Sequence, residues 1–285
     1  MRIRQSDLAA YGRCAQQKRL VDLSRTGEGP APRQLSATAF GTVMHHALQA
    51  MEQLHHQGRT DALEVAQATF VHYWNPANIS ELTEPVDEWI ARQTHGGLQR
   101  KGKDSLALHY EYLKGKGANE KLLALELNFN LPMLVDGVWH EISGTVDRLA
   151  IKKYQGKSFV SIEDFKTGIQ KEHLRWNVQF TMYGWASTQQ GFWDQWDNGV
   201  DLWKAYQPLG RRGTWINLKN GYKRADAGWR GPQDYARLHV AIREYVRAVE
   251  AGIYPLNLDG AVCEYCPFRD TCGGVAVPDK EYGTP

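Results

Sequence analysis

Two things are scarce in this sequence: long hydrophobic runs and net charge. No stretch approaches the roughly 18 uncharged residues that a membrane span requires, and residues 1–7 lack the apolar stretch of a signal peptide. We therefore expect a cytoplasmic protein with no membrane partner. The formal net charge of +2 excludes a molecule coated in basic surface, so any nucleic-acid binding must come from local patches.

Cysteine is also scarce, with four residues in a chain of 285. Cys263, Cys266 and Cys272 form a C-x2-C-x5-C cluster, and Cys14 lies near the opposite end of the chain. Disulfides are disfavoured in an intracellular protein, whereas four thiolates are the ligand set of a zinc site or an iron–sulfur cluster. Ligand type alone leaves both open. Either group would tie Cys14 to the C-terminal segment as a structural staple.

Hydrophobic residues make up 42% of the chain, which is ample for a core, and their spacing predicts an α/β fold. Helical spacing begins at Ser36 and recurs over 61–73, over 87–113 with an interruption near Gly96 and Gly97, and over 172–189. Ser6 fits the N-cap of an earlier helix. Three consecutive strands are predicted over 122–131, 138–151 and 158–165. This order indicates a mixed sheet flanked by helices.

Candidate chemistry gathers where the last two predicted strands meet. Alternate side chains of an extended chain share a face, so Asp164 and Lys166 point the same way. Asp147 lies within reach, because neighbouring strands are roughly 4.8 Å apart. Two carboxylates, the imidazole of His45 and waters form a reasonable shell for Mg²⁺ or Mn²⁺. A lysine beside them can orient and help deprotonate an attacking water.

Gln179 and Tyr183 complete the group, since residues four apart share one face of a helix. Each feature alone has an ordinary interpretation: His45 as a satisfied buried histidine with His46 as the functional one, Asp147 as a turn cap, and Gln179 with Tyr183 as the rim of the core. These interpretations would have to coincide in the right order along the chain. Their combination therefore favours a functional site.

The motifs resemble the PD-(D/E)XK nuclease superfamily, specifically its RecB-like branch, which includes the CRISPR-associated family-four exonucleases and phage-encoded relatives. The matching segments are GTVMH at 41–45, GTVD at 144–147, EDFKTG at 163–168 and QFTMY at 179–183. The resemblance implies a restriction-endonuclease-like core with a helical N-terminal insertion. The catalytic residues that it implies are Asp147, Asp164, Lys166, Gln179 and Tyr183. The metal ligands that it implies are His45, Asp147, Asp164 and the carbonyl of Phe165, and Glu126 takes the place of an upstream strand acid.

By the same resemblance we expect a divalent-metal-dependent DNA exonuclease that acts on single-stranded DNA or DNA ends in repair or recombination, with a helicase or recombination protein as a further partner. Relatives hold one-plus-three cysteines around a [4Fe-4S] cluster, which favours that cluster over Zn²⁺ at Cys14, Cys263, Cys266 and Cys272 and would join the two termini. A phage-encoded member would be located in the host cytoplasm. The alternatives are an endonuclease for branched or nicked DNA and a DNA-binding subunit of a recombination complex.

We expect one domain over residues 1–285. Within it we distinguish a helical region at 36–121, a catalytic core at 122–190, a strand and helix region at 191–255, and a cluster-binding module formed by 256–285 with Cys14.

The region from 211 to 230 interleaves basic and aromatic residues. Arg211, Arg212, Lys223 and Arg224 would contact phosphates and Trp215 would stack on a base, a combination that suits single strands without sequence preference. The alternative is a hairpin whose aromatic residues face the core and whose charges are solvated.

Overall fold

The computed structural model describes residues 1–87, 89, 93–115, 120–167, 177–218, 223–257, 260–264 and 266–272. Its six-stranded sheet is formed by β1 (Arg2–Arg4), β2 (Glu120–Val135), β3 (Val138–Tyr154), β4 (Lys157–Lys166), β5 (Gly210–Asn217) and β6 (Lys223–Arg230). The helices are α1 (Gln5–Arg13), α2 (Ala15–Thr26), α3 (Ser36–His56), α4 (Ala62–Trp74), α5 (His95–Lys114), α6 (Val178–Ala186), α7 (Gln190–Trp193), α8 (Gly199–Tyr206), α9 (Pro232–Glu250) and α10 (Gly260–Glu264), with a 3-10 turn η1 at Ile79–Glu81.

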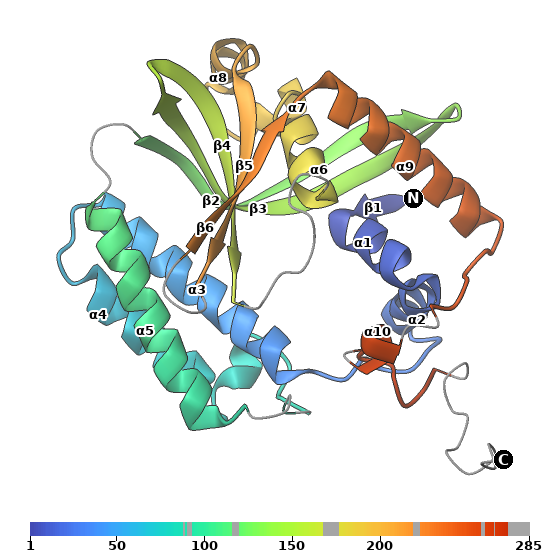
Figure 1. The fold of residues 1–285 in the computed structure, drawn as a ribbon, viewed down its shortest axis with the longest axis horizontal. Helices are drawn as coiled ribbons and strands as arrows, with labels where there is room; N and C mark the ends of the chain where they lie inside the picture. The colour runs from blue at the N-terminus through green and yellow to red at the C-terminus, as the bar shows by residue number, and fades with distance from the viewer. Residues whose placement is uncertain are drawn as a thin grey trace, which may run out of the picture.

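The predicted mixed sheet flanked by helices is confirmed (Figure 1). Two local predictions are wrong. Arg4, not Ser6, is the N-cap of α1, because the Asp7 carboxylate accepts the Arg4 backbone N–H at 2.9 Å. Gly97 does not interrupt α5 but lies in its first turn, where its N–H donates to the Thr94 hydroxyl. Gly168 and part of the helix predicted over 172–189 lie outside the described residues.

Strand β3 organises the sheet, because three other strands pair with it. β2 runs antiparallel along one edge of β3. β1 and β4 must therefore share the other edge, β1 parallel along 141–143 and β4 antiparallel along 148–154. Residues 144–147 of β3 lie between these two partners. From β4 the sheet continues through β5, which is parallel to β4, to β6, which is antiparallel to β5.

Each face of the sheet has its own apolar cluster. Helices α6, α7 and α9 cover one face, where Phe180, Phe192 and Ile242 pack with Ile3 and Val146. Helices α3, α4 and α5 cover β4 and β5 on the other face (Figure 1). The apolar residues of α3 recur at spacings of three and four, which directs one stripe of this helix into the core. This stripe carries Met44, and with it the neighbouring His45, to the sheet.

A buried ionic network fixes α3 to the sheet. The guanidinium of Arg148 in β3 is fully buried, and it contacts Glu52 of α3 at 2.7 Å, Glu163 of β4 at 2.5 Å, and Glu120 of β2. Burial alone would raise the pKa of Glu52, but Arg148 and a hydrogen bond with His109 hold that pKa well below its ordinary value. The ionised carboxylate of Glu52 thus depends on Arg148.

Helix α1 contacts the segment that follows α9. Tyr11 donates its hydroxyl to the carbonyl of Ile253 at 2.8 Å, and the Asn257 amide donates to the carbonyl of Arg13 at 2.6 Å. Figure 1 shows α1 and α2 next to the end of α9 and to α10.

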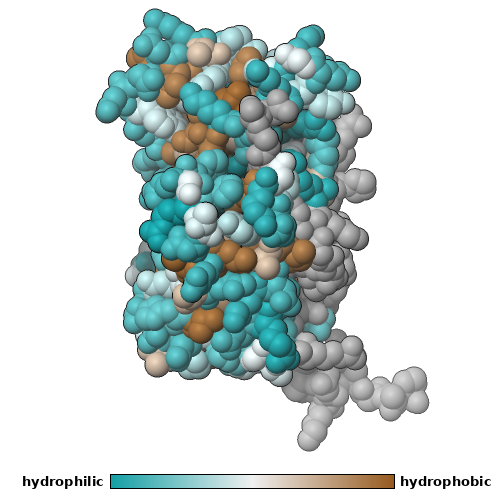
Figure 2. Space-filling view, turned by 90° about the vertical axis from the view of Figure 1, so that its left-hand side faces the viewer, coloured by the Kyte–Doolittle hydropathy of each residue, from teal (hydrophilic) through white to brown (hydrophobic). Residues whose placement is uncertain are grey.

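Among the described residues, no helix combines the length and apolar character needed to cross a bilayer. The face that carries α4 and α5 is largely hydrophilic, with apolar residues in small groups (Figure 2).

Candidate metal-dependent active site

The candidate site lies at the gap on the edge of β3 between β1 and β4. Asp147 stands at the end of this gap, where its Oδ2 accepts the backbone N–H of Phe165 at 2.7 Å. This bond joins β3 to the end of β4, which presents Asp164 and Lys166. Asp147, Asp164 and Lys166 therefore lie together at a stretch of the β3 edge that neither β1 nor β4 covers.

His45 of α3 reaches the same place from the other side. Its Nδ1 lies 3.3 Å from Glu126 Oε1 and 3.5 Å from Asp147 Oδ2, while its Nε2 lies 3.2 Å from the carbonyl oxygen of Phe165. In the neutral ring that donates its Nε2–H to that carbonyl, the Nδ1 lone pair would be available to a cation held by the two carboxylates. His45, Glu126 and Asp147 offer ligand atoms that all lie within 4.8 Å of one another. That spacing and donor set fit a divalent cation.

Asp164, Lys166, Gln179 and Tyr183 form a chain of polar contacts beside this group. Lys166 Nζ lies 2.7 Å from Asp164 Oδ2 and 3.4 Å from Gln179 Oε1. The Gln179 amide donates to Asp164 Oδ1 at 2.6 Å and to the Tyr183 hydroxyl oxygen at 3.2 Å. The side chains of Gln179 and Tyr183 project from the same face of α6, as their spacing predicted. Gln179 thus orients both the carboxylate and the ammonium.

The electrostatics of the site favour a bound cation. Burial raises the pKa of Asp164 to about 6, and the Asp147 carboxylate adds to the rise. Burial raises the pKa of Asp147 as well. Burial alone would lower the pKa of His45, but the carboxylates of Asp147 and Glu126 outweigh it and raise that pKa to about 9. Burial also raises the pKa of Tyr183, so its hydroxyl stays protonated.

Glu126 holds a strained backbone conformation. Its φ of 48° lies in the left-handed region that non-glycine residues rarely adopt. This conformation interrupts the alternation of β2 and places the carboxylate beside His45. Strain of this kind persists where surrounding structure imposes it, and it is frequent at functional sites. The sequence indicated Glu126 only through its place upstream of the other acids.

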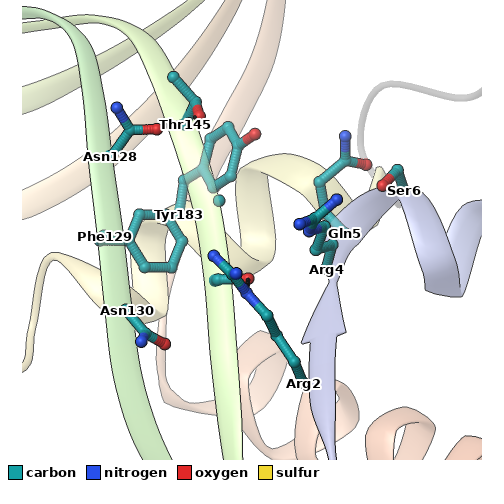
Figure 3. Close-up of a pocket in the computed structure, with 11 residues that line it drawn as sticks. Arg2, Arg4, Gln5, Ser6, Asn128, Phe129, Asn130, Thr145 and Tyr183 are labelled. Carbon is teal, nitrogen blue, oxygen red and sulfur yellow. Dashed lines mark hydrogen bonds between the residues drawn. The ribbon is translucent and has the colours of Figure 1, made fainter. Parts of the chain in front are cut away.

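Two cavities open next to these residues. One, of about 320 Å³, is lined by Lys166, Gln179 and Trp215 together with Gln5 and Ser6 at the start of α1. The other, of about 510 Å³, also reaches Gln5 and Ser6 and extends to Arg2, Arg4 and Tyr183 (Figure 3). The candidate site is therefore accessible from the side of α1 and β1.

Two of the five residues predicted to bind nucleic acid are buried instead. Arg211 is 3% exposed, and its guanidinium donates to Ser187 and to the carbonyls of Gln207 and Leu209. Trp215 is 4% exposed and packs in the core. Phe180 of α6 packs on the Trp215 ring, and the residues that follow α6 and α8 enclose the Arg211 guanidinium. Arg211 therefore offers no surface to DNA, and Trp215 offers only the edge that lines the cavity beside Lys166.

The remaining three differ from one another. Arg212 pairs with Asp226 and lies over the rings of Tyr154 and Trp229. Arg224 pairs with Glu163 at 2.9 Å. Lys223 lies in β6 opposite Asn217, and its side chain lies outside what the structure describes. The alternative of a hairpin with aromatic residues in the core holds for Trp215 but not for Trp229, which is half exposed.

The four cysteines line one small cavity, of about 20 Å³, together with Leu20 and Val262. None of them forms a disulfide. Burial raises the pKa of the Cys266 thiol. Cys14 and the C-terminal triplet thus line the same cavity, but no three of these four described residues have sulfur atoms within 4.8 Å of one another, and a group bound there stays a prediction.

Sequence reasoning missed the polar residues that line the larger cavity, above all Arg2, Arg4, Asn128 and Asn130. A signal was available, because Arg2, Ile3 and Arg4 alternate charged and apolar side chains with the period of a strand. The buried network around Arg148 was missed as well, since its members are scattered over five elements.

The sequence profile of the PD-(D/E)XK nuclease superfamily matches residues 2–273, and the chain belongs to this superfamily. Membership implies metal-dependent hydrolysis of nucleic-acid phosphodiester bonds. No curated protein matches the chain. A solved structure, described as the crystal structure of SSO0001, is 13% identical and aligns over 91% of this chain and 95% of that chain with a TM-score of 0.35, which is too low to support a conclusion.

Proposed function

We propose that the protein is a DNA exonuclease of the RecB-like branch that acts on single-stranded DNA or DNA ends. The observation that carries the proposal is the convergence of Asp147, Asp164 and Lys166 with His45 and Glu126 at one gap in the sheet. We infer one domain over 1–285 with the four regions distinguished above, and a helicase or recombination protein as a further partner.

His45, Glu126, Asp147 and Asp164 are the residues that would hold Mg²⁺ or Mn²⁺; a ligand role for the Phe165 carbonyl stays a prediction. When bound, such an ion polarises the phosphate and lowers the pKa of an attacking water. Lys166 contributes an ammonium fixed between Asp164 and Gln179, positioned to orient that water and to offset charge on the phosphate. Tyr183 keeps its proton and holds the Gln179 amide in place.

We further propose a structural [4Fe-4S] cluster, with Zn²⁺ as the alternative, held by Cys14, Cys263, Cys266 and Cys272. The support is that the four thiols are free and share one apolar cavity. Its role would be to stabilise the contact between the two ends of the chain, since hydrolysis requires no electron transfer.

The test of the nuclease uses end-labelled single-stranded, blunt duplex and closed circular single-stranded DNA, with Mg²⁺ or Mn²⁺ and with EDTA. Asp164→Asn and Lys166→Ala should each lower cleavage by about 10²- to 10⁴-fold. Asp201→Asn and Lys204→Ala make the same chemical changes at exposed positions of α8 and should leave cleavage unchanged. Full cleavage by the Asp164→Asn protein would contradict the site, and cleavage of circles as fast as linear strands would contradict the exonuclease.

A further inference from the structure

A polar surface runs from the candidate site along β3 toward the β2–β3 hairpin. Ile142 and Val146 point into the core beneath α6 and α9. Because side chains alternate along a strand, Trp139, Ser143 and Asp147 lie on the opposite face. The eight residue steps from Asp147 to Trp139 span about 26 Å at roughly 3.3 Å per residue. This length is enough to hold several nucleotides of an extended strand.

Cationic and amide side chains flank this stretch of β3. Arg4 of β1 is paired across the sheet with Ser143, and Asn130 of β2 is paired with Ser143 from the other edge. One row further, Arg2 lies opposite Glu141. The burial pattern of β2 alternates buried apolar residues with exposed ones that include Asn128 and Asn130. Guanidinium groups therefore stand on one side of the stretch and amides on the other.

The surface is hollowed along this whole length. The cavity at Lys166 meets the cavity of about 510 Å³ at Gln5 and Ser6. That cavity in turn shares Arg2 and Asn130 with a third, of about 530 Å³, which Trp139 lines. Figure 3 shows Arg2 and Arg4 of β1 facing Asn128 and Asn130 of β2 across the middle cavity.

The chemistry of the lining suits a nucleic acid. Arg4 is exposed, and no described acidic side chain pairs with its guanidinium. Arg2 neutralises Glu141 at 3.1 Å and also donates to the Ser143 hydroxyl at 3.0 Å. Trp139 is 66% exposed and is paired across the hairpin with Leu134, which is 52% exposed, so this end of the surface offers contiguous apolar area to a partner. Beside it, His140 is 4% exposed, and neither of its ring nitrogens has a hydrogen-bond partner among the described residues.

We propose that Arg2, Arg4, Asn128, Asn130 and Trp139 form a track that binds a single strand of nucleic acid and leads it to Lys166. The arginines contact phosphates, the amides contact sugar and base edges, and the Trp139 ring stacks on a base. A single strand is the ligand because only an unpaired base exposes its face to a ring. The inference rests on the proposed nuclease and assigns its substrate path.

The test measures binding of a short fluorescein-labelled oligothymidylate by anisotropy in EDTA over a series of salt concentrations. Arg2→Gln/Arg4→Gln should weaken binding and flatten the slope of log K against log salt by about 1.4, since a single strand loses ~0.7 per phosphate contact. Trp139→Ala should lower affinity about tenfold, and Trp139→Phe should restore most of it. Melting curves check that these exposed substitutions leave the fold intact.

The matched control is Arg237→Gln/Arg243→Gln, which removes two arginines from the solvent side of α9. The track would be overturned if this control lost as much binding affinity as Arg2→Gln/Arg4→Gln. It would also be overturned if Arg2→Gln/Arg4→Gln left the slope of log K against log salt unchanged. If Trp139→Ala weakens binding of a blunt duplex as much as binding of the oligothymidylate, a single strand is not the specific ligand of the track. If the variants lose binding as expected but the native protein cleaves no DNA with Mg²⁺ or Mn²⁺, the track stands and the proposed nuclease fails.

Discussion

Replacing Arg148 by methionine should destabilise the protein strongly. The Arg148 side chain and the carboxylates of Glu52 and Glu163 are all fully buried. Methionine keeps much of the volume but leaves Glu52 with only histidines as described partners. Breaking a buried ion pair by removing one partner costs about 3–5 kcal/mol. At about 2–4 °C per kcal/mol for a chain of this size class, the melting temperature should fall by about 6–20 °C.

Urea denaturation at pH 7, followed by tryptophan fluorescence, measures this change. Arg247→Met is the control, because its partner Asp136 is exposed and such surface pairs contribute about 1 kcal/mol or less. The folded-state pKa of Glu52 is depressed below 4.5. The ionised Glu52 therefore contributes fully to the free energy of unfolding above pH 4.5. This contribution is lost as the pH falls toward the pKa of Glu52 in the folded state. The difference between the native protein and Arg148→Met should narrow under acid.

A loss in Arg148→Met no larger than in Arg247→Met would refute the view that the network fixes α3 to the sheet. In a double-mutant cycle, Glu52→Gln with Arg148→Met should cost less than the sum of the single changes, because Glu52→Gln removes the charge that Arg148→Met would leave buried and unpaired.

Gly144→Ala should cost about 1–3 kcal/mol of folding free energy, because a Cβ there would lie 2.8 Å from the Tyr183 ring and 2.9 Å from the Phe129 ring. Gly12→Ala, in α1 with nothing within 4 Å, should instead be neutral or stabilising in the same denaturation assay. For the cysteines, anaerobic purification should yield about four iron and four sulfide per chain, and Cys14→Ser should lower both the iron content and the melting temperature. Stoichiometric zinc without iron would overturn the cluster.

The sequence predicted the positions of functional residues correctly where two of them lie close together in the chain at the spacing of a strand or a helix. Asp164 and Lys166 share a strand face, and Gln179 and Tyr183 share a helix turn, so short-range geometry alone placed each pair correctly. Strand spacing put Asp147 within reach of Asp164, whereas the place of His45 rested on its donor chemistry and on the resemblance. The contact between His45 and Asp147 depends on how α3 packs on the sheet, and residues far apart in the chain decide that.

Prediction from the sequence failed where the burial of a side chain depends on which helix packs over its strand. Arg211 and Trp215 alternate with neighbours in a pattern that fits a surface or a core equally well. The packing of α6, and of the residues that follow α6 and α8, over β5 determines which face is buried. The alternation of Arg2, Ile3 and Arg4 indicates a strand, but no local pattern shows that this strand pairs in parallel with residues 141–143 of β3. The position of Arg2 and Arg4 beside the candidate site could therefore not be predicted from the sequence.

The position of β1 has a consequence for how the protein is made. The contact between Arg2 and Ser143 joins residues 141 apart, so at about 5–20 residues per second the first strand waits ~7–30 s for its partner to emerge from the ribosome. The contact between Tyr11 and Ile253 spans 242 residues and therefore forms later still. Residues 2–13 are thus fixed long after they are synthesised. A nascent chain can assemble Asp147 and Asp164 well before α1 and β1 dock beside them.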